Sequence, residues 1–267
     1  MSKLTYTIID SADSSFNKTS VLVTGETEAL VVDAAFTRAD GYRIAAAVLD
    51  SGKSLTGVVI TAGDPDFYFG AEVLADAFPG VRFFAPLDVI EHIHASYLTK
   101  LKTWGHLGTN LPTRLVDLQP LLTNPVVDGH TLELRRASDK VGDRAWFLFD
   151  PQARVLLGGV LLFQGLHVWT ADSSTPESRA AWIEALDALE ALQPTVVVAG
   201  HRTPDAATDL SAIEYTRDYL RFFDLMVTAA PDAAAAHDAL LAAYPDAGLV
   251  IAASLGTKVA QGEMAWG

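Results

Sequence analysis

Residues 55–70 read Leu-Thr-Gly-Val-Val-Ile-Thr-Ala-Gly-Asp-Pro-Asp-Phe-Tyr-Phe-Gly. Residues 55–61 form a short apolar run, which is typical of a strand buried on both faces. An acidic loop follows at the carboxyl end of this strand, where Asp64 and Asp66 flank a proline. A helical pattern begins directly after Gly70. This stretch therefore predicts a buried strand, a polar loop and a helix in succession, as in proteins of mixed α and β structure.

Length and charge limit the classes of protein to consider. The chain has 267 residues, half of them hydrophobic, so a single large domain is expected over residues 1–267. We expect its core over about residues 1–205 and a C-terminal helical extension over about 206–267. The net charge of −14 predicts a surface that repels nucleic acid and anionic membranes. Neither is therefore expected as a partner.

The absence of cysteine excludes several kinds of site. Disulfides, thiolate metal sites and a cysteine nucleophile are all impossible without it. No apolar run reaches the roughly 20 residues that a membrane-spanning helix needs. The N-terminal residues lack a basic segment followed by an apolar one, so no signal peptide is expected. These features together predict a cytoplasmic protein.

Two groups of predicted strands, each followed by helices, run along the chain. The first group is expected at residues 4–9, 20–24, 29–33, 55–61 and 81–85, with helices at 42–51, 71–77 and 88–102. The second is expected at 127–136, 145–149, 155–162 and 195–199, with helices at 176–192, 210–229 and 232–244. Residues 103–125 are rich in turn-forming residues and predict a long loop. Two such halves suit two packed sheets with helices outside.

The loop at Thr61–Gly70 resembles the metal-binding loop of the metallo-β-lactamase superfamily, which reads Thr-His-x-His-x-Asp-His. Other segments resemble the family in the same order along the chain: Asn17–Leu22, Leu30–Ala34, Val155–Phe163 and Val196–His201. The resemblance covers roughly residues 15–205. It implies an α/β (α+β) fold, the four-layer αββα sandwich of that superfamily, followed here by C-terminal helices.

The resemblance also implies that most metal ligands of the family are missing. The three histidine positions of the loop hold Ala62, Asp64 and Phe67. Only Asp66 keeps the residue type of the family loop. The aspartate that bridges two metals falls at Val160, whose side chain cannot bind a metal. Two complete zinc sites are therefore excluded.

One weaker metal site remains an option in this interpretation. It would combine four side chains, Asp64, Asp66, Asp139 and His201. Three carboxylates and one imidazole favour Mn²⁺ or Mg²⁺, or Zn²⁺ with reduced affinity. Asp143 lies four residues beyond Asp139 and is an alternative ligand, because the length of this loop varies.

Acid–base chemistry without a metal is the other option. His201 follows Gly200 at the end of a predicted buried strand, where α/β proteins place ligand groups. Asp66 would orient His201, which would activate a water or a substrate proton. Tyr68 would donate a hydrogen bond, and Asp64 is a further acid or base. In the purely structural alternative, Asp64 caps the next helix and Asp66 holds the loop in place.

Several residues outside the loop are candidates for binding substrate: Trp104, His167, Trp169 and, from the helical pair His92 and His94, His94. Residues two apart point to different faces of a helix, so only one of this last pair is expected at the pocket. Lys100, Lys102 and His106 lie near Trp104 and suggest an anionic or aromatic substrate. His130 lies in a predicted hairpin turn and is expected at the surface.

The resemblance implies a hydrolase of a small-molecule ester, lactone or thioester. It would be metal-free or would bind a single weak Zn, Mn or Mg ion. Loss of the ligands makes a non-catalytic small-molecule binding protein the first alternative, and a metal-free lyase or isomerase the second. Aromatic residues at positions 215, 219, 222 and 223 follow helical spacing and either pack on the core or form a homodimer face.

Overall fold

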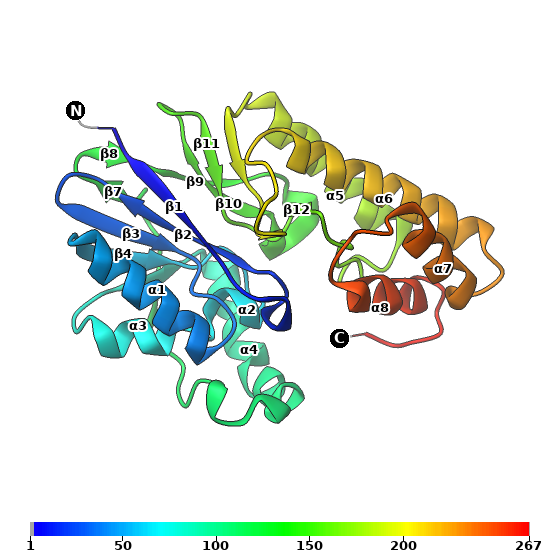
Figure 1. Cartoon of the computed structure of the whole chain (residues 1–267), viewed down its shortest axis with the longest axis horizontal. Coiled ribbons are helices and arrows are strands. Elements are labelled where there is room, and N and C mark those ends of the chain that lie inside the picture. Colours follow the sequence, from blue (N-terminus) through cyan, green and yellow to red (C-terminus); the bar gives the residue numbers. More distant parts are fainter. Residues whose placement is uncertain (1–2, 267) are drawn as a thin grey trace.

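Two β-sheets packed face to face form the centre of the molecule, described by a computed structural model over residues 3–266 (Figure 1). The first sheet contains, in spatial order, β1 (Thr5–Asp10), β2 (Thr19–Thr24), β3 (Glu28–Val32), β4 (Ser54–Val59), β5 (Phe83–Ala85) and β6 (Leu118–Pro120). The second contains β13 (Val196–Val198), β11 (Val155–Leu157), β10 (Trp146–Asp150) and β9 (Glu133–Arg136). Two short pairs are added, β12 (Phe163–Gln164) with β14 (His201–Arg202) and β7 (Val126–Val127) with β8 (His130–Thr131).

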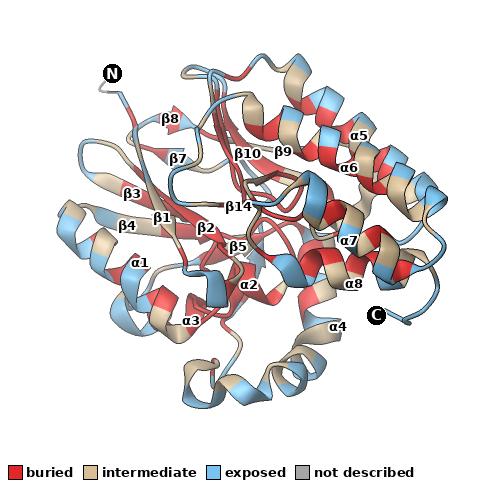
Figure 2. Ribbon diagram, turned by 45° about the vertical axis from the view of Figure 1, so that its right-hand side comes forward, coloured by how far each residue is buried: buried red, intermediate tan, exposed pale blue. Residues whose placement is uncertain are grey.

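Helices cover the outer face of each sheet (Figure 2). Those against the first sheet are α1 (Arg38–Ser51), α3 (Ala71–Ala77) and α4 (Leu87–Thr103), with the single turn α2 (Pro65–Tyr68) between sheet and helix α3. Those against the second sheet are α5 (Pro176–Ala191) and α6 (Ser211–Ala229). Thr175 caps α5 as its sequence predicts, by accepting a hydrogen bond from the backbone of Ser178.

Side-chain alternation along the strands produces three apolar layers. Val31 points to the helices of the first half, whereas its neighbour Val32 points between the sheets. In the second sheet, Leu157 packs between the sheets, and Leu156 packs towards Trp182 of α5. This alternation is the period-two pattern of β-strands buried on both faces. The predicted four-layer αββα sandwich is therefore confirmed.

Three helices close the chain, α6, α7 (Ala233–Ala243) and α8 (Val250–Ala260). Tyr219 and Phe223 of α6 are fully buried in the core of the second half, so this aromatic face packs internally. Helix α8 was not predicted, because Gly256 lowers the helical propensity of its sequence. A Cβ at Gly256 would lie 2.1 Å from the hydroxyl of Thr170, so the glycine permits close packing of α8.

Two local expectations were wrong. The predicted strand at residues 155–162 ends at Leu157, because Gly158 and Gly159 both adopt positive φ angles, +71° and +81°, and turn the chain towards the pocket. His130 is not at the surface but lies in strand β8 with only 8% of its surface exposed. It pairs there with Val127, and the turn residues Asp128 and Gly129 project beyond it.

The helices of the described chain were compared with the length and hydropathy that a membrane-spanning helix needs. Between residues 3 and 266, no helix is both long and apolar enough to span a bilayer.

Candidate active site

The ends of three strands meet in a buried hydrogen-bonded junction below the acidic loop. Asp33 follows β3 and accepts hydrogen bonds from the backbone N–H and the hydroxyl of Thr61, both at 2.8 Å. The backbone N–H of Gly159 donates in turn to the hydroxyl of Thr61 at 2.9 Å. Asp33, Thr61 and Gly159 therefore tie the loop that follows β4 to the second sheet. This junction fixes the backbone from which Asp64 and Asp66 project.

A lysine that the sequence analysis did not single out is buried beside this junction. Lys18 has no exposed surface, and its ammonium lies 3.1 Å from the equally buried carboxylate of Asp33. It also donates to the backbone carbonyl of Thr19. The same ammonium lies 4.1 Å from the ring centroid of Phe67, the residue at a histidine position of the family loop. The ammonium of Lys18 therefore lies under the acidic loop, between Asp33 and Phe67.

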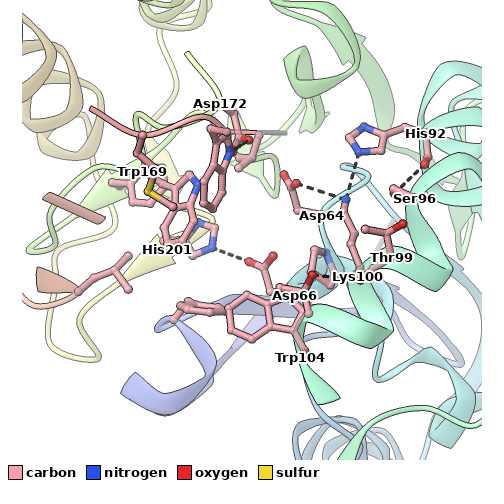
Figure 3. Close-up of a pocket in the computed structure, with 18 of the residues that line it drawn as sticks. Asp64, Asp66, His92, Ser96, Thr99, Lys100, Trp104, Trp169, Asp172 and His201 are labelled. Atoms are coloured by element: carbon pink, nitrogen blue, oxygen red, sulfur yellow. Dashed lines mark hydrogen bonds and ion pairs between the residues drawn. The ribbon is translucent and has the colours of Figure 1, made fainter. Parts of the chain in front are cut away.

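Asp66 and His201 form a buried pair at the edge of the pocket. His201 Nε2 lies 2.7 Å from Asp66 Oδ2, as the sequence-based pairing of these residues requires (Figure 3). The position of His201 depends on Gly200, because a Cβ there would lie 2.0 Å from the carbonyl oxygen of Gly159. Phe163 stacks on the imidazole with 4.7 Å between ring centroids and an interplanar angle of 7°. The pair is thus held rigidly on both sides.

The electrostatics of this pair favour an anionic Asp66 and a neutral imidazole. Burial lowers the pKa of His201 and outweighs the opposing effect of Asp66. Burial also opposes ionisation of Asp66, but the hydrogen bond from His201 and the nearby charge of Lys18 outweigh it and lower the pKa of Asp66. Neutral His201 then donates from Nε2 to Asp66. Its Nδ1 is buried and has no hydrogen-bond partner among the described residues.

Asp64 is an acid–base group that faces the pocket. It occupies the position before α2, yet its side chain makes no capping hydrogen bond, so the capping alternative does not explain it. About 23% of its side chain is exposed, and its Oδ1 lies 3.8 Å from the ammonium of Lys100. Burial, followed by the neighbouring carboxylate of Asp172, raises the pKa of Asp64 to about 6. A carboxyl group with this pKa can take up and release a proton near neutral pH.

One face of α4 supplies a polar wall of the pocket. The residues that line it follow helical spacing: His92, Ser96, Thr99, Lys100 and Thr103 (Figure 3). The ammonium of Lys100 donates to the carbonyl oxygen of Gly63 at 2.7 Å and lies 3.1 Å from Nε2 of His92. Nδ1 of His92 forms a hydrogen bond with the carboxylate of Asp143. The chain from Asp143 through His92 fixes Lys100 beside Asp64.

Aromatic side chains form the remaining walls of a pocket of about 620 Å³. The rings that line it are Phe16, Trp104, Phe163, Trp169 and Trp266. Val160 also lies on the pocket wall. Such a volume suits a small molecule, and so does an apolar wall with a few polar groups. Trp104 and Trp169 thus lie at the pocket as expected.

Three candidate site residues lie elsewhere. Tyr68 is 2% exposed and does not line the pocket, and its hydroxyl has no hydrogen-bond partner among the described residues. His167 is fully buried, where its Nδ1 lies 3.0 Å from the hydroxyl of Tyr219. His94 is exposed on α4, because the helix turns His92 to the pocket instead. The sequence spacing could not fix which of these side chains points inward.

The residues present do not fit a metal centre. The side chain of Asp139 is 94% exposed, and its carboxylate lies 3.4 Å from the guanidinium of Arg136, away from Asp66 and His201. Its alternative, Asp143, is engaged by His92. Within residues 3–266, no group of three or more His, Cys, Asp or Glu side chains is arranged to hold a metal ion. The four-ligand site suggested by the resemblance is therefore not assembled.

The sandwich, the strand-end junction and the His201 position agree with one known family. A family model described as the metallo-beta-lactamase superfamily matches residues 15–201. The chain belongs to the metallo-β-lactamase superfamily. It is a divergent member, because the solved structures of the superfamily described next are only 13–16% identical to it. No curated protein sequence gives a significant match.

Solved structures of superfamily members share the fold at low sequence identity. A metallo-β-lactamase family protein of Thermus thermophilus is 16% identical with a TM-score of 0.65, over 97% of this chain and 93% of that chain. A metallo-β-lactamase of Pontibacter korlensis is 16% identical with a TM-score of 0.56, over 83% of this chain and 96% of that chain. The DIM-1 metallo-β-lactamase is 13% identical with a TM-score of 0.55, over 82% of this chain and 92% of that chain. These similarities concern the superfamily fold alone.

Several residues at or below the pocket were not predicted as site residues, among them Lys18, Phe16, Asp172 and Trp266. The polar stripe on α4 was visible in the sequence, since its members recur at helical intervals ending in Thr103. Trp266 bonds Asp172 through its indole N–H at 2.7 Å, a contact between distant segments. A local sequence pattern cannot predict a contact between segments so far apart in the chain.

Proposed function

We propose that this protein hydrolyses a small ester, lactone or thioester without a catalytic metal, with Asp64 as the general base. The observation that carries the proposal is the position of Asp64. It faces a small-molecule pocket, has no capping role and lies beside both Lys100 and Asp66. Superfamily membership supports hydrolysis as the type of reaction, by analogy at the level of the fold.

The first step is attack of water on the acyl carbon. Asp64 removes a proton from the water while the water oxygen forms a bond to the acyl carbon. Anionic Asp66, held by His201, accepts a hydrogen bond from the same water and orients it. Negative charge then develops on the acyl oxygen, and the ammonium of Lys100 is the nearest cationic group of the pocket wall to stabilise it.

The second step releases the alcohol or thiol. The tetrahedral intermediate collapses, and the bond from the acyl carbon to the leaving oxygen or sulfur breaks. Protonated Asp64 returns its proton to the leaving group, so the same residue serves as base and then as acid. The products are a carboxylic acid and an alcohol or thiol, and Asp64 returns to its anionic form.

Hydrolysis without metal is tested with purified full-length protein and a panel of p-nitrophenyl butyrate, a γ-lactone and an acyl thioester. We expect turnover of at least one substrate class to stay within about twofold after dialysis against a chelator, because the donor set does not fit a metal. Activity that arises only when Zn²⁺, Mn²⁺ or Mg²⁺ is added contradicts the metal-free mechanism. Saturable ligand binding without turnover of any class supports the binding-protein alternative.

The pH dependence of hydrolysis follows from the raised pKa of Asp64, about 6. A general base must be ionised, so kcat/KM should be constant well above pH 6 and fall as the pH decreases through 6. At pH 5 we expect roughly a tenfold reduction, because about one tenth of the carboxyl groups remain ionised. A kcat/KM profile of the same substrate between pH 4.5 and 8.5 measures this. A rate that increases towards low pH would assign Asp64 the opposite role, that of an initial acid.

A further inference from the structure

We infer that the pocket recognises a substrate with a positively charged ammonium group close to its acyl bond. This inference rests on the proposed hydrolytic function and names the class of substrate for it. Two independent features carry it, the excess of carboxylates on the pocket wall and the aromatic faces beside them.

The side chains that line the pocket carry more negative than positive charge. Three carboxylates line it, those of Asp64, Asp66 and Asp172, against the single ammonium of Lys100. Lys18 and Arg144 lie behind this wall, where their charges act on Asp66 and Asp64 but their cationic groups do not line the pocket. The ammonium of Lys100 already donates to the carbonyl oxygen of Gly63 and lies close to Nε2 of His92. These contacts within the protein reduce its capacity to bind an anionic ligand. A cationic ligand relieves the mutual repulsion of the carboxylates, whereas an anionic ligand adds to it.

Asp172 is the carboxylate best placed to meet a ligand cation. No cationic side chain pairs with it within residues 3–266; its Oδ1 instead accepts the indole N–H of Trp266 at 2.7 Å. Figure 3 shows Trp169 and Asp172 on one side of the pocket and α4 with Lys100 on the other. The two sides of the pocket thus differ in charge. An ammonium group of the substrate can bind on the Asp172 side, while the acyl group lies beside Lys100.

Aromatic rings continue the wall on the Asp172 side. Trp169 lies 5.8 Å from both Trp266 and Phe16, and Phe16 lies 5.2 Å from Trp104, measured between ring centroids. The six cation–π contacts found in the described chain use other rings, so these faces carry no protein cation. Ammonium groups bind to the faces of such rings, and most strongly to tryptophan. An aromatic wall beside a free carboxylate is the arrangement that recognises an alkylammonium ion.

The whole molecule adds to this preference. Its net charge of −14 attracts cations and repels anions over distances beyond the pocket. The expectation of an anionic substrate came from the basic residues near Trp104, but Lys102 is exposed and does not line the pocket. His106 lines a neighbouring hollow near Phe36. Of the three basic residues that suggested an anion, only Lys100 therefore lines the pocket.

The test compares two esters of equal shape and different charge. Butyrylcholine carries a trimethylammonium group, and 3,3-dimethylbutyl butyrate carries a neutral carbon in its place. We expect kcat/KM to favour the charged ester by about 5- to 30-fold, the range that one desolvated cation–π contact provides. Asp172→Asn should reduce this ratio at least about threefold, since it removes the free carboxylate. Asp50→Asn, an exposed carboxylate on α1 outside the pocket, should leave the ratio unchanged.

Binding of benzyltrimethylammonium, followed by tryptophan fluorescence, separates the two ideas. Saturable binding that weakens in Asp172→Asn, with no ester hydrolysed, keeps the cationic ligand and overturns the hydrolase. Hydrolysis with equal or greater kcat/KM for the neutral ester keeps the hydrolase and overturns the cationic class. If benzyltrimethylammonium does not bind and the two esters are hydrolysed equally well, the cationic substrate class is also overturned.

Discussion

Asp64→Asn should lower kcat/KM for the best ester substrate by about 10²- to 10⁴-fold, the usual contribution of a general acid or base. The amide has nearly the shape of the carboxylate but cannot remove a proton from water. Because the Asp64 side chain makes no capping hydrogen bond, the substitution should leave the stability of α2 nearly unchanged. The remaining activity should also lose its dependence on a group of pKa about 6. Initial rates and circular dichroism of both proteins measure these effects.

A matched control for Asp64→Asn is Asp50→Asn, which changes an exposed carboxylate on α1 that does not line the pocket. Its kcat/KM should equal that of the unmodified protein. If Asp64→Asn keeps more than about a third of the activity while folded, Asp64 is not the general base, because even weak general catalysis exceeds that factor.

Lys18→Met should reduce the free energy of unfolding by about 3–5 kcal/mol, the usual effect of breaking a buried ion pair. Both Lys18 and Asp33 have no exposed side-chain surface, so the remaining Asp33 carboxylate would be buried without its cation. Burial already raises the pKa of Asp33, and the charge of Lys18 is the main opposing influence. Urea unfolding followed by tryptophan fluorescence measures the difference.

The double variant Lys18→Met/Asp33→Asn distinguishes lost charge balance from lost packing. It should recover at least about 1 kcal/mol relative to Lys18→Met, because no buried charge remains unpaired. The amide oxygen at position 33 can still accept the hydrogen bond that Thr61 donates from its backbone. Lys102→Met, at an exposed position of α4, should change stability by less than about 0.5 kcal/mol. A Lys18→Met loss below about 1 kcal/mol would show that the pair contributes little.

The fold could be predicted because several independent patterns agreed. Apolar runs such as residues 55–61 fix strands, Thr175 and Gly52 fix helix ends, and the ordered family segments fix the architecture. The errors lie where a backbone conformation depends on contacts between distant segments. Helix α8 was missed because Gly256 lowers the helical propensity of its sequence, and the close contact with Thr170 that requires a glycine there involves a distant segment.

The site could be predicted only where backbone position fixes the side chain. Asp66 and His201 were placed correctly together, because each follows a strand end whose position the fold determines. Asp139 was misplaced because it begins a short 3₁₀ helix in which its side chain points to solvent beside Arg136, an orientation that the sequence spacing does not indicate. Lys18 was missed because a lysine before a strand normally reaches solvent, and only the assembled fold encloses it with Asp33.

Lys18 and Phe67 limit how a metal site could be engineered at this loop. The ammonium of Lys18 lies 4.1 Å from the Phe67 ring centroid. Phe67→His alone would place a metal ligand beside this cation, and a divalent ion bound there would be repelled. Replacing Lys18 alone would leave the carboxylate of Asp33 buried without its cation. An engineered metal site therefore needs coordinated changes at Lys18, Asp33 and the ligand positions.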